Sequence, residues 1–316
     1  MKSTRDAYGE VLVELGKTRA DIVVLDADVS KATRTEGFAK KYPERFINVG
    51  CAEANLIGTA AGLSLVGKLP FVSTMAVFAS CRALDQIRNT VCYPRLNVKI
   101  IATHGGITVG ADGATHQSVE DISIMRSLPN MTVIVPSDSI ETQKAIRAVA
   151  DYTGPVYVRL GRDALPEVTA PESPFTIGRG LVLKEGKDIG IFACGIMVGT
   201  ALEAADALAV EGISAKVIDM HTVKPLDEEL ILRTCKEVKA MISAEENNVL
   251  GGLGGGIAEI VSRHRGGPLA IIGIRDTFGE SGTPKELLAK YGLNKESIIQ
   301  TARELLSEQA LYTILP

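Results

Sequence analysis

The chain of 316 residues contains no tryptophan, and its aromatic residues amount to only 4%. Proteins that bind single-stranded nucleic acid rely on aromatic side chains for base stacking, so this class is disfavoured. The formal net charge is −4, from 34 Lys and Arg against 38 Asp and Glu, which gives no overall positive field for nucleic acid or an anionic membrane. An anionic ligand must therefore be held by a local group of basic side chains.

Cysteines and long apolar runs are also scarce. The five cysteines are odd in number and have no CxxC spacing, which favours reduced thiols over disulfides or a zinc site. No apolar signal segment follows Met1, and the longest uncharged stretches, such as residues 189–202, fall short of the ~20 residues that a membrane-spanning helix needs. We therefore expect a cytoplasmic protein that neither enters a membrane nor binds nucleic acid.

What the chain does have is 46% apolar residues and 31 glycines, a composition typical of a compact fold with many tight turns. Up to residue 165, short β-branched runs alternate with longer segments of helical spacing, which is the pattern of a parallel sheet covered by helices. Strands are predicted at 22–25, 46–49, 69–73, 98–103, 131–135 and 155–160. Residues 1–165 are thus expected to form a domain with a mostly parallel sheet of six strands.

The periodicity stops between residues 166 and 178, where Pro166, Pro171 and Pro174 fall close together, so this segment is predicted to be a linker. Strand-like runs resume at 189–193, 215–220, 240–244 and 269–274, and a helix is predicted over 295–308. Residues 179–316 are therefore expected to form a second, smaller domain. The predicted fold class is α/β, with two tandem three-layer domains.

Polar and aromatic side chains follow five of the six strands of the first predicted sheet. In open parallel sheets, ligands bind outside the carboxyl ends of the strands, where loops and helix N-termini meet. The residues placed at that edge are Asp28, Glu53, Phe78, His104 and Arg162. Taken singly, Glu53 would equally suit a helix N-terminus and His104 a hydrogen-bonded core position. Their common position makes this edge the candidate site.

A long glycine-rich loop, residues 105–115, lies between His104 and His116, two of only four histidines. Long loops inside a compact domain are usually functional. Asp112 in this loop also suits ordinary turn chemistry before Gly113. His104, Asp112 and His116 have the residue types of a two-histidine, one-carboxylate metal site, but the glycine-rich spacer gives that set no preset geometry, so it is the weaker interpretation.

Two glycine motifs fail as nucleotide sites. Residues 62–68 read GxxxxGK, but Leu69 stands where a P-loop has Ser or Thr, and the motif leads into a predicted strand. Residues 251–256 follow a predicted strand and open a helix, but they do not match GxGxxG. We expect the second run to be a tight turn, or a vestigial or regulatory anion pocket.

With these residues in place, the sequence resembles the C-terminal portion of transketolases over essentially its whole length. The segments that carry the resemblance are 46–55 (FINVGCAEAN), 85–88 (DQIR), 102–104 (ATH), 110–117 (GADGATHQ) and 128–131 (LPNM). The stretch from His104 to His116 is the most specific. The resemblance implies the family's pyrimidine-binding domain followed by its C-terminal domain, in an enzyme that uses thiamine diphosphate to move a two-carbon ketol unit between sugar phosphates.

The resemblance also implies roles for the residues that would hold the cofactor. Glu53 would bond the aminopyrimidine ring and favour its imino tautomer, so that the exocyclic nitrogen removes the thiazolium proton. Phe78 would stack on the pyrimidine, and Asp28 would lie near the thiazolium ring. Met75 and Cys81 would line the pyrimidine pocket, where many transketolases have aromatic residues.

Further residues would hold the substrate. His116 would hydrogen-bond the substrate hydroxyls and the reaction intermediate, and Asp112 would bind a sugar hydroxyl. Arg5, His104 and Arg162 would clamp the terminal phosphate, for which arginine supplies charge and a forked geometry.

The chain departs from the family pattern at several positions. Ala32 replaces a common phosphate-binding serine, and Ala111 replaces a frequent acidic residue. The largest departure is that the sequence has no Gly-Asp-Gly motif, with which transketolases hold Mg²⁺ and the diphosphate on a preceding domain. We therefore expect this chain to be the C-terminal subunit of a split transketolase, completed by a separate subunit that binds the diphosphate and Mg²⁺ in an α₂β₂ assembly.

Three alternatives remain open. The β subunits of 2-oxo-acid dehydrogenases share this domain order, but His104 and the two arginines favour sugar phosphates. A 1-deoxyxylulose-5-phosphate synthase has a similar Gly-Ala-Asp-Gly loop, and His104 and Arg5 argue against it. A non-catalytic scaffold subunit would explain the missing Mg²⁺ motif, but it would not explain the complete set of polar site residues.

Overall fold

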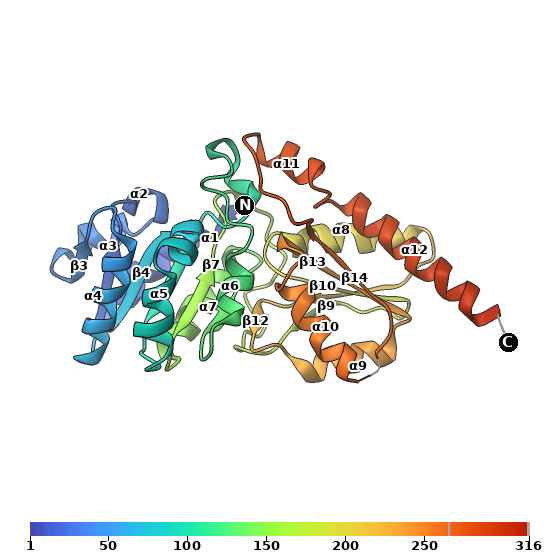
Figure 1. The fold of residues 1–316 in the computed structure, drawn as a ribbon, viewed down its shortest axis with the longest axis horizontal. Coiled ribbons are helices and arrows are strands. Elements are labelled where there is room, and N and C mark those ends of the chain that lie inside the picture. The colour runs from blue at the N-terminus through green and yellow to red at the C-terminus, as the bar shows by residue number, and fades with distance from the viewer. Residues whose placement is uncertain (265, 315–316) are drawn as a thin grey trace.

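The computed structural model describes residues 1–264 and 266–314, which form two α/β domains side by side (Figure 1). The first domain is built on a sheet with the strand order β12-β6-β7-β5-β4-β2-β3. Its strands are β2 (Ile22–Asp26), β3 (Phe46–Asn48), β4 (Leu69–Met75), β5 (Lys99–Thr103), β6 (Thr132–Ile134), β7 (Val156–Arg159) and β12 (Thr222–Lys224). Neighbours are parallel except β12 and β6, which are antiparallel.

The six predicted strands are all present, but the prediction of a six-stranded sheet was wrong, because a seventh strand joins from the second domain. The strand β12 is only three residues long and pairs with β6 at the sheet edge. Three residues are too few to show a hydrophobic periodicity. The strand that β12 pairs with is also far away in the sequence, so no local pattern indicates the pairing. The first sheet is therefore not formed by one continuous stretch of the chain.

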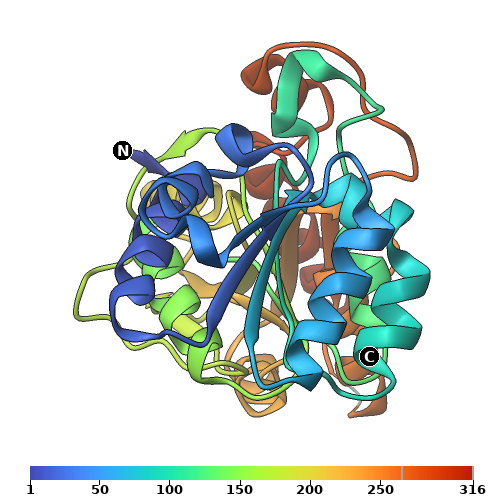
Figure 2. The same ribbon diagram turned by 90° about the vertical axis from the view of Figure 1, so that its left-hand side faces the viewer.

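Helices cover both faces of the first sheet (Figure 2). One face packs against α1 (Thr4–Thr18), α3 (Glu36–Lys41) and α7 (Ser139–Asp151). The other face packs against α4 (Glu53–Leu65), the π-helical segments η2 (Phe78–Arg82) and η3 (Ile87–Cys92), α5 (Leu84–Gln86), and α6 (Asp121–Ser127). Shorter helical turns are α2 (Ser30–Thr33), η1 (Pro43–Arg45) and η4 (Ile107–Asp112). This arrangement leaves the carboxyl ends of the strands to the loops.

The second domain has five strands, in the order β14-β13-β10-β11-β9. They are β9 (Leu181–Lys184), β10 (Ile189–Ala193), β11 (Ala215–Asp219), β13 (Ala240–Asn248) and β14 (Leu269–Ile274). Only β9 is antiparallel to its neighbour. The sequence predicted the four parallel strands and missed β9, because it is half-buried along its whole length and lacks the apolar run of a covered strand.

The helices of the second domain are α8 (Met197–Val210), α9 (Glu228–Glu237), α10 (Leu253–Arg263), α11 (Pro284–Lys290) and α12 (Lys295–Ile314). Side chains from α9 and α10, among them Leu230 and Ile257, lie in the same buried apolar cluster as Ile122 and Met125 of α6. This buried cluster therefore spans both domains. Within the part of the chain that the structure describes, no helix combines the length and apolar character needed to cross a membrane.

Two features join segments around the carboxyl edge of the first sheet. The strand β1 (Lys2–Ser3) pairs with β8 (Ala164–Leu165), which brings the start of α1 beside the end of β7. Helix α11 packs against η4, so that the second domain touches the glycine-rich loop (Figure 1). Residues 166–180 contain no helix or strand and lie along α7, where the Asp138 carboxylate accepts hydrogen bonds from the N–H groups of Val168 and Thr169.

Candidate functional site at the carboxyl edge of the first sheet

Glu53 is the first residue of α4, directly after the loop that follows β3. Its side chain is only 6% exposed. A carboxylate at a helix N-terminus is stabilised by the helix dipole, which explains why this carboxylate tolerates a nearly covered position. Arg82 Nη1 donates a hydrogen bond to Glu53 Oε1 at 3.3 Å.

Phe78, Arg82 and His116 extend this contact into a connected group. The guanidinium of Arg82 lies 4.1 Å from the centroid of the Phe78 ring, and the His116 ring meets Phe78 edge-on at 5.4 Å between centroids. Phe78 and Arg82 are the first and last residues of the π-helical segment η2, a type of irregularity that often marks functional sites. The structure therefore brings together Glu53 and Phe78, which the sequence placed at one edge, and His116, which follows the glycine-rich loop.

Cys81 lies in the same segment and is exposed. Its thiol points to Glu120, with 3.7 Å between Sγ and Oε1. Partial burial of the sulfur, together with the Glu120 carboxylate, raises the pKa of the Cys81 thiol, so the thiol is not activated as a nucleophile. Met75, the last residue of β4, is half-buried three positions before Phe78.

His104 forms a second group with Arg5. His104 is 3% exposed and has a left-handed backbone with φ of 58°. Burial, and then the charges of Arg5 and Arg162, lower its pKa to about 4, so the ring is neutral at pH 7. Arg5 Nη1 lies 3.2 Å from Nε2, and an arginine can only donate, so Nε2 accepts. The proton of the neutral ring is then on Nδ1, which donates to the hydroxyl of Thr103 at 2.8 Å.

Arg5 and Arg162 make this second group strongly basic. Burial and the nearby Arg34 lower the pKa of Arg5, as expected for positive charges that are close together. Arg5 Nη1 donates to the carbonyl of Ala32 at 3.0 Å, but its Nε is buried and has no hydrogen-bond partner among the residues that the structure describes. Arg162 Nη1 donates to Asp112 Oδ2 at 3.1 Å. A buried guanidinium N–H without an acceptor is the feature expected of a site that receives an anion.

Asp28 stands apart from both groups. It has a left-handed φ of 65° and is exposed, and its backbone N–H and carboxylate both bond the side-chain amide of Asn48. Its described hydrogen bonds hold a turn and do not reach Glu53 or Phe78. The sequence placed Asp28 at the correct edge, and its nearness to a cofactor stays a prediction.

The metal-site interpretation finds no support in the described part of the chain, whereas the glycine run at 251–256 forms the tight turn that the sequence predicted as one of two possibilities. Among residues 1–264 and 266–314 there is no cluster of histidine, cysteine and carboxylate side chains able to hold a metal ion, and Asp112 pairs with Arg162 instead. The glycine run at 251–256 opens α10 as a turn, and the carboxylate of Glu245 accepts hydrogen bonds there from the N–H groups of Leu253 and Gly254 at 2.8 and 2.9 Å. The anion position at that helix N-terminus is thus filled by the chain itself.

The glycine-rich loop is held by residues that the sequence analysis missed. Gln117 Nε2 donates to the carbonyls of Ile107 at 3.3 Å, Gly110 at 3.1 Å and Glu280 at 2.8 Å, the last from the second domain. Glu246, on β13 of the second domain, accepts a hydrogen bond from the N–H of Thr108 at 2.7 Å. The loop that carries Asp112 and His116 is therefore supported by both domains.

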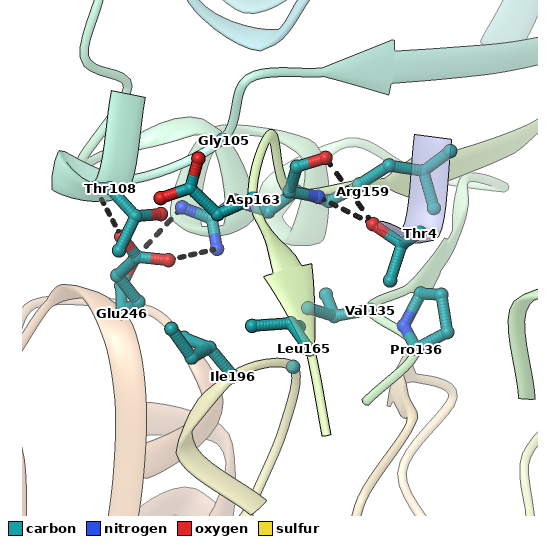
Figure 3. A pocket seen from close by; sticks show the side chains of 13 residues that line it. Thr4, Gly105, Thr108, Val135, Pro136, Arg159, Asp163, Leu165, Ile196 and Glu246 are labelled. Atoms are coloured by element: carbon teal, nitrogen blue, oxygen red, sulfur yellow. Dashed lines mark hydrogen bonds and ion pairs between the residues drawn. The ribbon is translucent and has the colours of Figure 1, made fainter. Parts of the chain in front are cut away.

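Figure 3 shows the contact between the two domains beneath that loop, with Glu246 between Thr108 and Arg159. Arg159, 5% exposed, pairs with Asp121 at 3.1 Å and donates to the carbonyl of Glu246 at 2.8 Å. The enclosed space here measures about 20 Å³, room for about one water molecule. At Gly106, with φ of 83°, a Cβ atom would lie 2.1 Å from the Glu246 carboxyl carbon, so the close approach of loop and strand requires glycine.

Comparison with known proteins gives concordant matches to both domains. The family described as "Transketolase, pyrimidine binding domain" matches residues 1–168, and "Transketolase, C-terminal domain" matches residues 178–298. A putative transketolase C-terminal section of Methanocaldococcus jannaschii is 49% identical over 98% of both chains. A 6-deoxy-6-sulfo-D-fructose transketolase subunit of a Clostridium species is 44% identical, over 95% of this chain and 94% of that protein.

One solved structure is similar over almost its full length. It is described as a split gene transketolase in the form of an inactive β4 tetramer. It is 52% identical to this chain, with a TM-score of 0.91, and the match covers 97% of this chain and 99% of that one.

Proposed function

Because the chain belongs to the transketolase family, as a C-terminal section with the pyrimidine-binding and C-terminal domains, we propose that it is one subunit of a transketolase that uses thiamine diphosphate. The proposed reaction transfers a two-carbon ketol unit from a ketose phosphate to an aldose phosphate. The observation that carries this proposal is the contact chain from Glu53 through Arg82 and Phe78 to His116.

Glu53 and Phe78 fit the aminopyrimidine ring of the cofactor. A nearly covered carboxyl can share a proton with a ring nitrogen without competition from water, and an aromatic ring beside it can take the pyrimidine face. Met75 and Cys81 would line the same pocket, and Asp28 would lie further along the edge. When bound, the cofactor supplies the electron sink for breaking and forming the carbon–carbon bond.

His116 and Asp112 would orient the sugar. The hydroxyl of Thr115 contacts Nδ1 of His116 at 3.0 Å, which leaves Nε2 for a substrate hydroxyl. Asp112 would bind another hydroxyl while its pairing with Arg162 holds it in place. Since the loop is held at both ends, these side chains are positioned before the substrate arrives.

Arg5, Arg162 and His104 would bind the terminal anion of the substrate. The positive charge comes from the two arginines, because His104 is neutral and acts by orienting Arg5 through Nε2. The name of the Clostridium relative specifies a sulfonated sugar. Sulfonate and phosphate are both tetrahedral anions, so the same basic group suits either, and we propose phosphate as the group bound here.

The diphosphate and Mg²⁺ would be held by a separate subunit, in an α₂β₂ assembly. The relative named a C-terminal section and the relative named a subunit both support a partner chain, and the related β4 tetramer is described as inactive. The cytoplasm remains the expected location.

The test is to purify this chain and the partner that co-purifies with it, and to measure ketol transfer with thiamine diphosphate and Mg²⁺. We expect activity from the mixture and none from either chain alone. Full activity of this chain alone would refute the split site. Activity with pyruvate as donor in place of a ketose phosphate would point to the synthase or dehydrogenase alternative. A complex that forms but has no activity with any donor would favour the scaffold.

A further inference from the structure

Arg82 contacts both side chains that the proposed function assigns to the cofactor ring. Its guanidinium lies 4.1 Å from the centroid of Phe78, and its Nη1 lies 3.3 Å from Glu53 Oε1. Within the described part of the chain, Arg82 is the one side chain that hydrogen-bonds Glu53. His116 meets the same ring only edge-on, with 72° between the ring planes, so it does not cover the face.

The chemistry of a guanidinium explains why it fits there. It is flat, it stacks on an aromatic face, and its edge carries N–H groups that bond a carboxylate. An aminopyrimidine ring has the same shape, stacks in the same way, and bonds a carboxyl group through its edge nitrogens. One position beside Phe78 and Glu53 therefore suits either group, but not both together.

We propose that Arg82 is a stand-in for the aminopyrimidine ring, which must swing out before the cofactor can bind. This inference rests on the proposed function, because it takes Glu53 and Phe78 as the ring's partners. In the free chain, Arg82 stabilises Glu53, which is a nearly buried carboxylate that would otherwise have no cationic partner. The residue thus balances the charge of Glu53 until the cofactor arrives.

The arrangement allows Arg82 to leave. Its side chain is 57% exposed, so water can solvate the guanidinium in another rotamer. An ion pair with an exposed partner and an exposed cation–π contact are both weak, which makes the stand-in easy to displace. We therefore expect a modest barrier to cofactor binding, and we do not expect a closed site.

The experiment measures binding of the ring alone, 4-amino-5-hydroxymethyl-2-methylpyrimidine, to the purified full chain by ligand-observed NMR titration. The Arg82→Ala variant removes both contacts, and we expect it to bind the ring about threefold to tenfold more tightly than the wild type. Arg82→Lys keeps the charge but loses the flat fork, so its affinity should fall between the two. The matched control is Arg233→Ala, an exposed arginine on α9 that pairs with Glu237.

The same titration on Glu53→Ala and Phe78→Ala separates the two hypotheses. If Arg82→Ala binds the ring as weakly as the wild type, or more weakly, while Glu53→Ala and Phe78→Ala lose binding, the stand-in is refuted and the proposed cofactor site stands. If Glu53→Ala and Phe78→Ala bind like the wild type, the cofactor site itself is refuted, and the stand-in with it. No binding by Arg82→Ala at any concentration reached also counts against the stand-in.

Discussion

The two sheets both place carboxylates at the carboxyl ends of their strands, but they use them differently. At the edge of the first sheet, Asp28 is exposed, and Glu53 is only 6% exposed but pairs with Arg82, which is 57% exposed. At the edge of the second sheet, Asp219, Glu245 and Glu246 are all buried. The first edge is the one that we propose to receive a ligand, whereas the carboxylates of the second edge are enclosed within the chain.

Two of the buried carboxylates of the second edge accept hydrogen bonds from backbone N–H groups. Glu245 binds the N-terminus of α10, and Glu246 binds the N–H of Thr108 in the first domain. Asp219 faces Glu141 of α7, and burial together with this neighbour raises the pKa of Asp219 well above its usual range. Burial likewise raises the pKa of Glu141 to about 7, so the pair retains a proton near neutral pH.

The difference teaches that strand topology alone does not make a site. Both edges have the loops and helix N-termini on which ligand binding at parallel sheets depends. The second edge faces the first domain, which covers it, so its carboxylates are buried where the two domains meet. Changes at the first edge should therefore affect activity, and changes at the second should affect stability.

The largest effect should come from Glu53→Gln in the assembled complex. This change keeps the shape but removes the acid that we propose shares a proton with the cofactor ring, so the rate of ketol transfer should fall about 10²–10⁴-fold. Steady-state kinetics at saturating cofactor measure it. The matched control is Glu44→Gln, an exposed glutamate on η1, which should keep the wild-type rate. A wild-type rate in Glu53→Gln would contradict the distinction between the two edges.

Arg159→Met should give the next largest effect, on stability. It leaves the buried carboxylates of Asp121 and Glu246 without their cation, and breaking a buried ion pair in this way costs about 3–5 kcal/mol. Urea unfolding measures the loss. The control is Arg147→Met, whose pair with Glu14 is exposed and should contribute less than about 1 kcal/mol. Equal losses of unfolding free energy in both variants would mean that the contact between the two domains does not depend on Arg159.

Glu245→Gln tests the second edge through pH. Burial raises the pKa of Glu245 to about 7 from an ordinary value of 4.5. Between these values the folded chain holds more protons than the unfolded chain, so this residue makes stability fall as the pH rises. Glutamine cannot titrate, so the stability advantage of the wild type should shrink by on the order of 1–3 kcal/mol between pH 5 and pH 7.5.

Urea unfolding of the wild type and of Glu245→Gln at several pH values measures that difference. Both proteins carry His104 and His221, so the opposite pH effect of these histidines cancels in the comparison. Burial lowers the pKa of both histidines to about 4, so they make stability fall as the pH drops below 6.5. A difference that stays constant with pH would show that Glu245 is ionised in the folded chain.

Gln117→Leu should give the smallest effect. It sharpens the comparison of the two edges, because Gln117 joins the glycine-rich loop of the first domain to the second domain. It removes three hydrogen bonds that hold the loop of Asp112 and His116, so kcat/KM should fall about tenfold, largely through KM. Gln300→Leu on α12 is the control, because its side chain bonds only Glu304 on the same helix. A loss of stability with unchanged kcat/KM would mean that the loop keeps its shape without Gln117.

The position of several candidate site residues in the fold was predictable from the sequence, although the site and the roles of its residues stay predictions. Glu53, Phe78 and His104 follow apolar strands that are readable locally, so the rule for parallel sheets places them at one edge. Arg82 was missed, although its position four residues after Phe78 in a helical segment was a usable signal. Gln117 and Glu246 had no such signal, because their partners Glu280 and Thr108 are 163 and 138 residues away.

The sequence by itself determined the α/β class, the six parallel strands of the first domain and the edge that carries the candidate site, because these depend on local periodicity and on the general geometry of parallel sheets. Only the tertiary structure decided that β12 crosses into the first sheet and that the second edge is closed by the first domain. Each of these depends on which surfaces meet when the two domains pack against each other, and that meeting leaves no pattern in either segment alone.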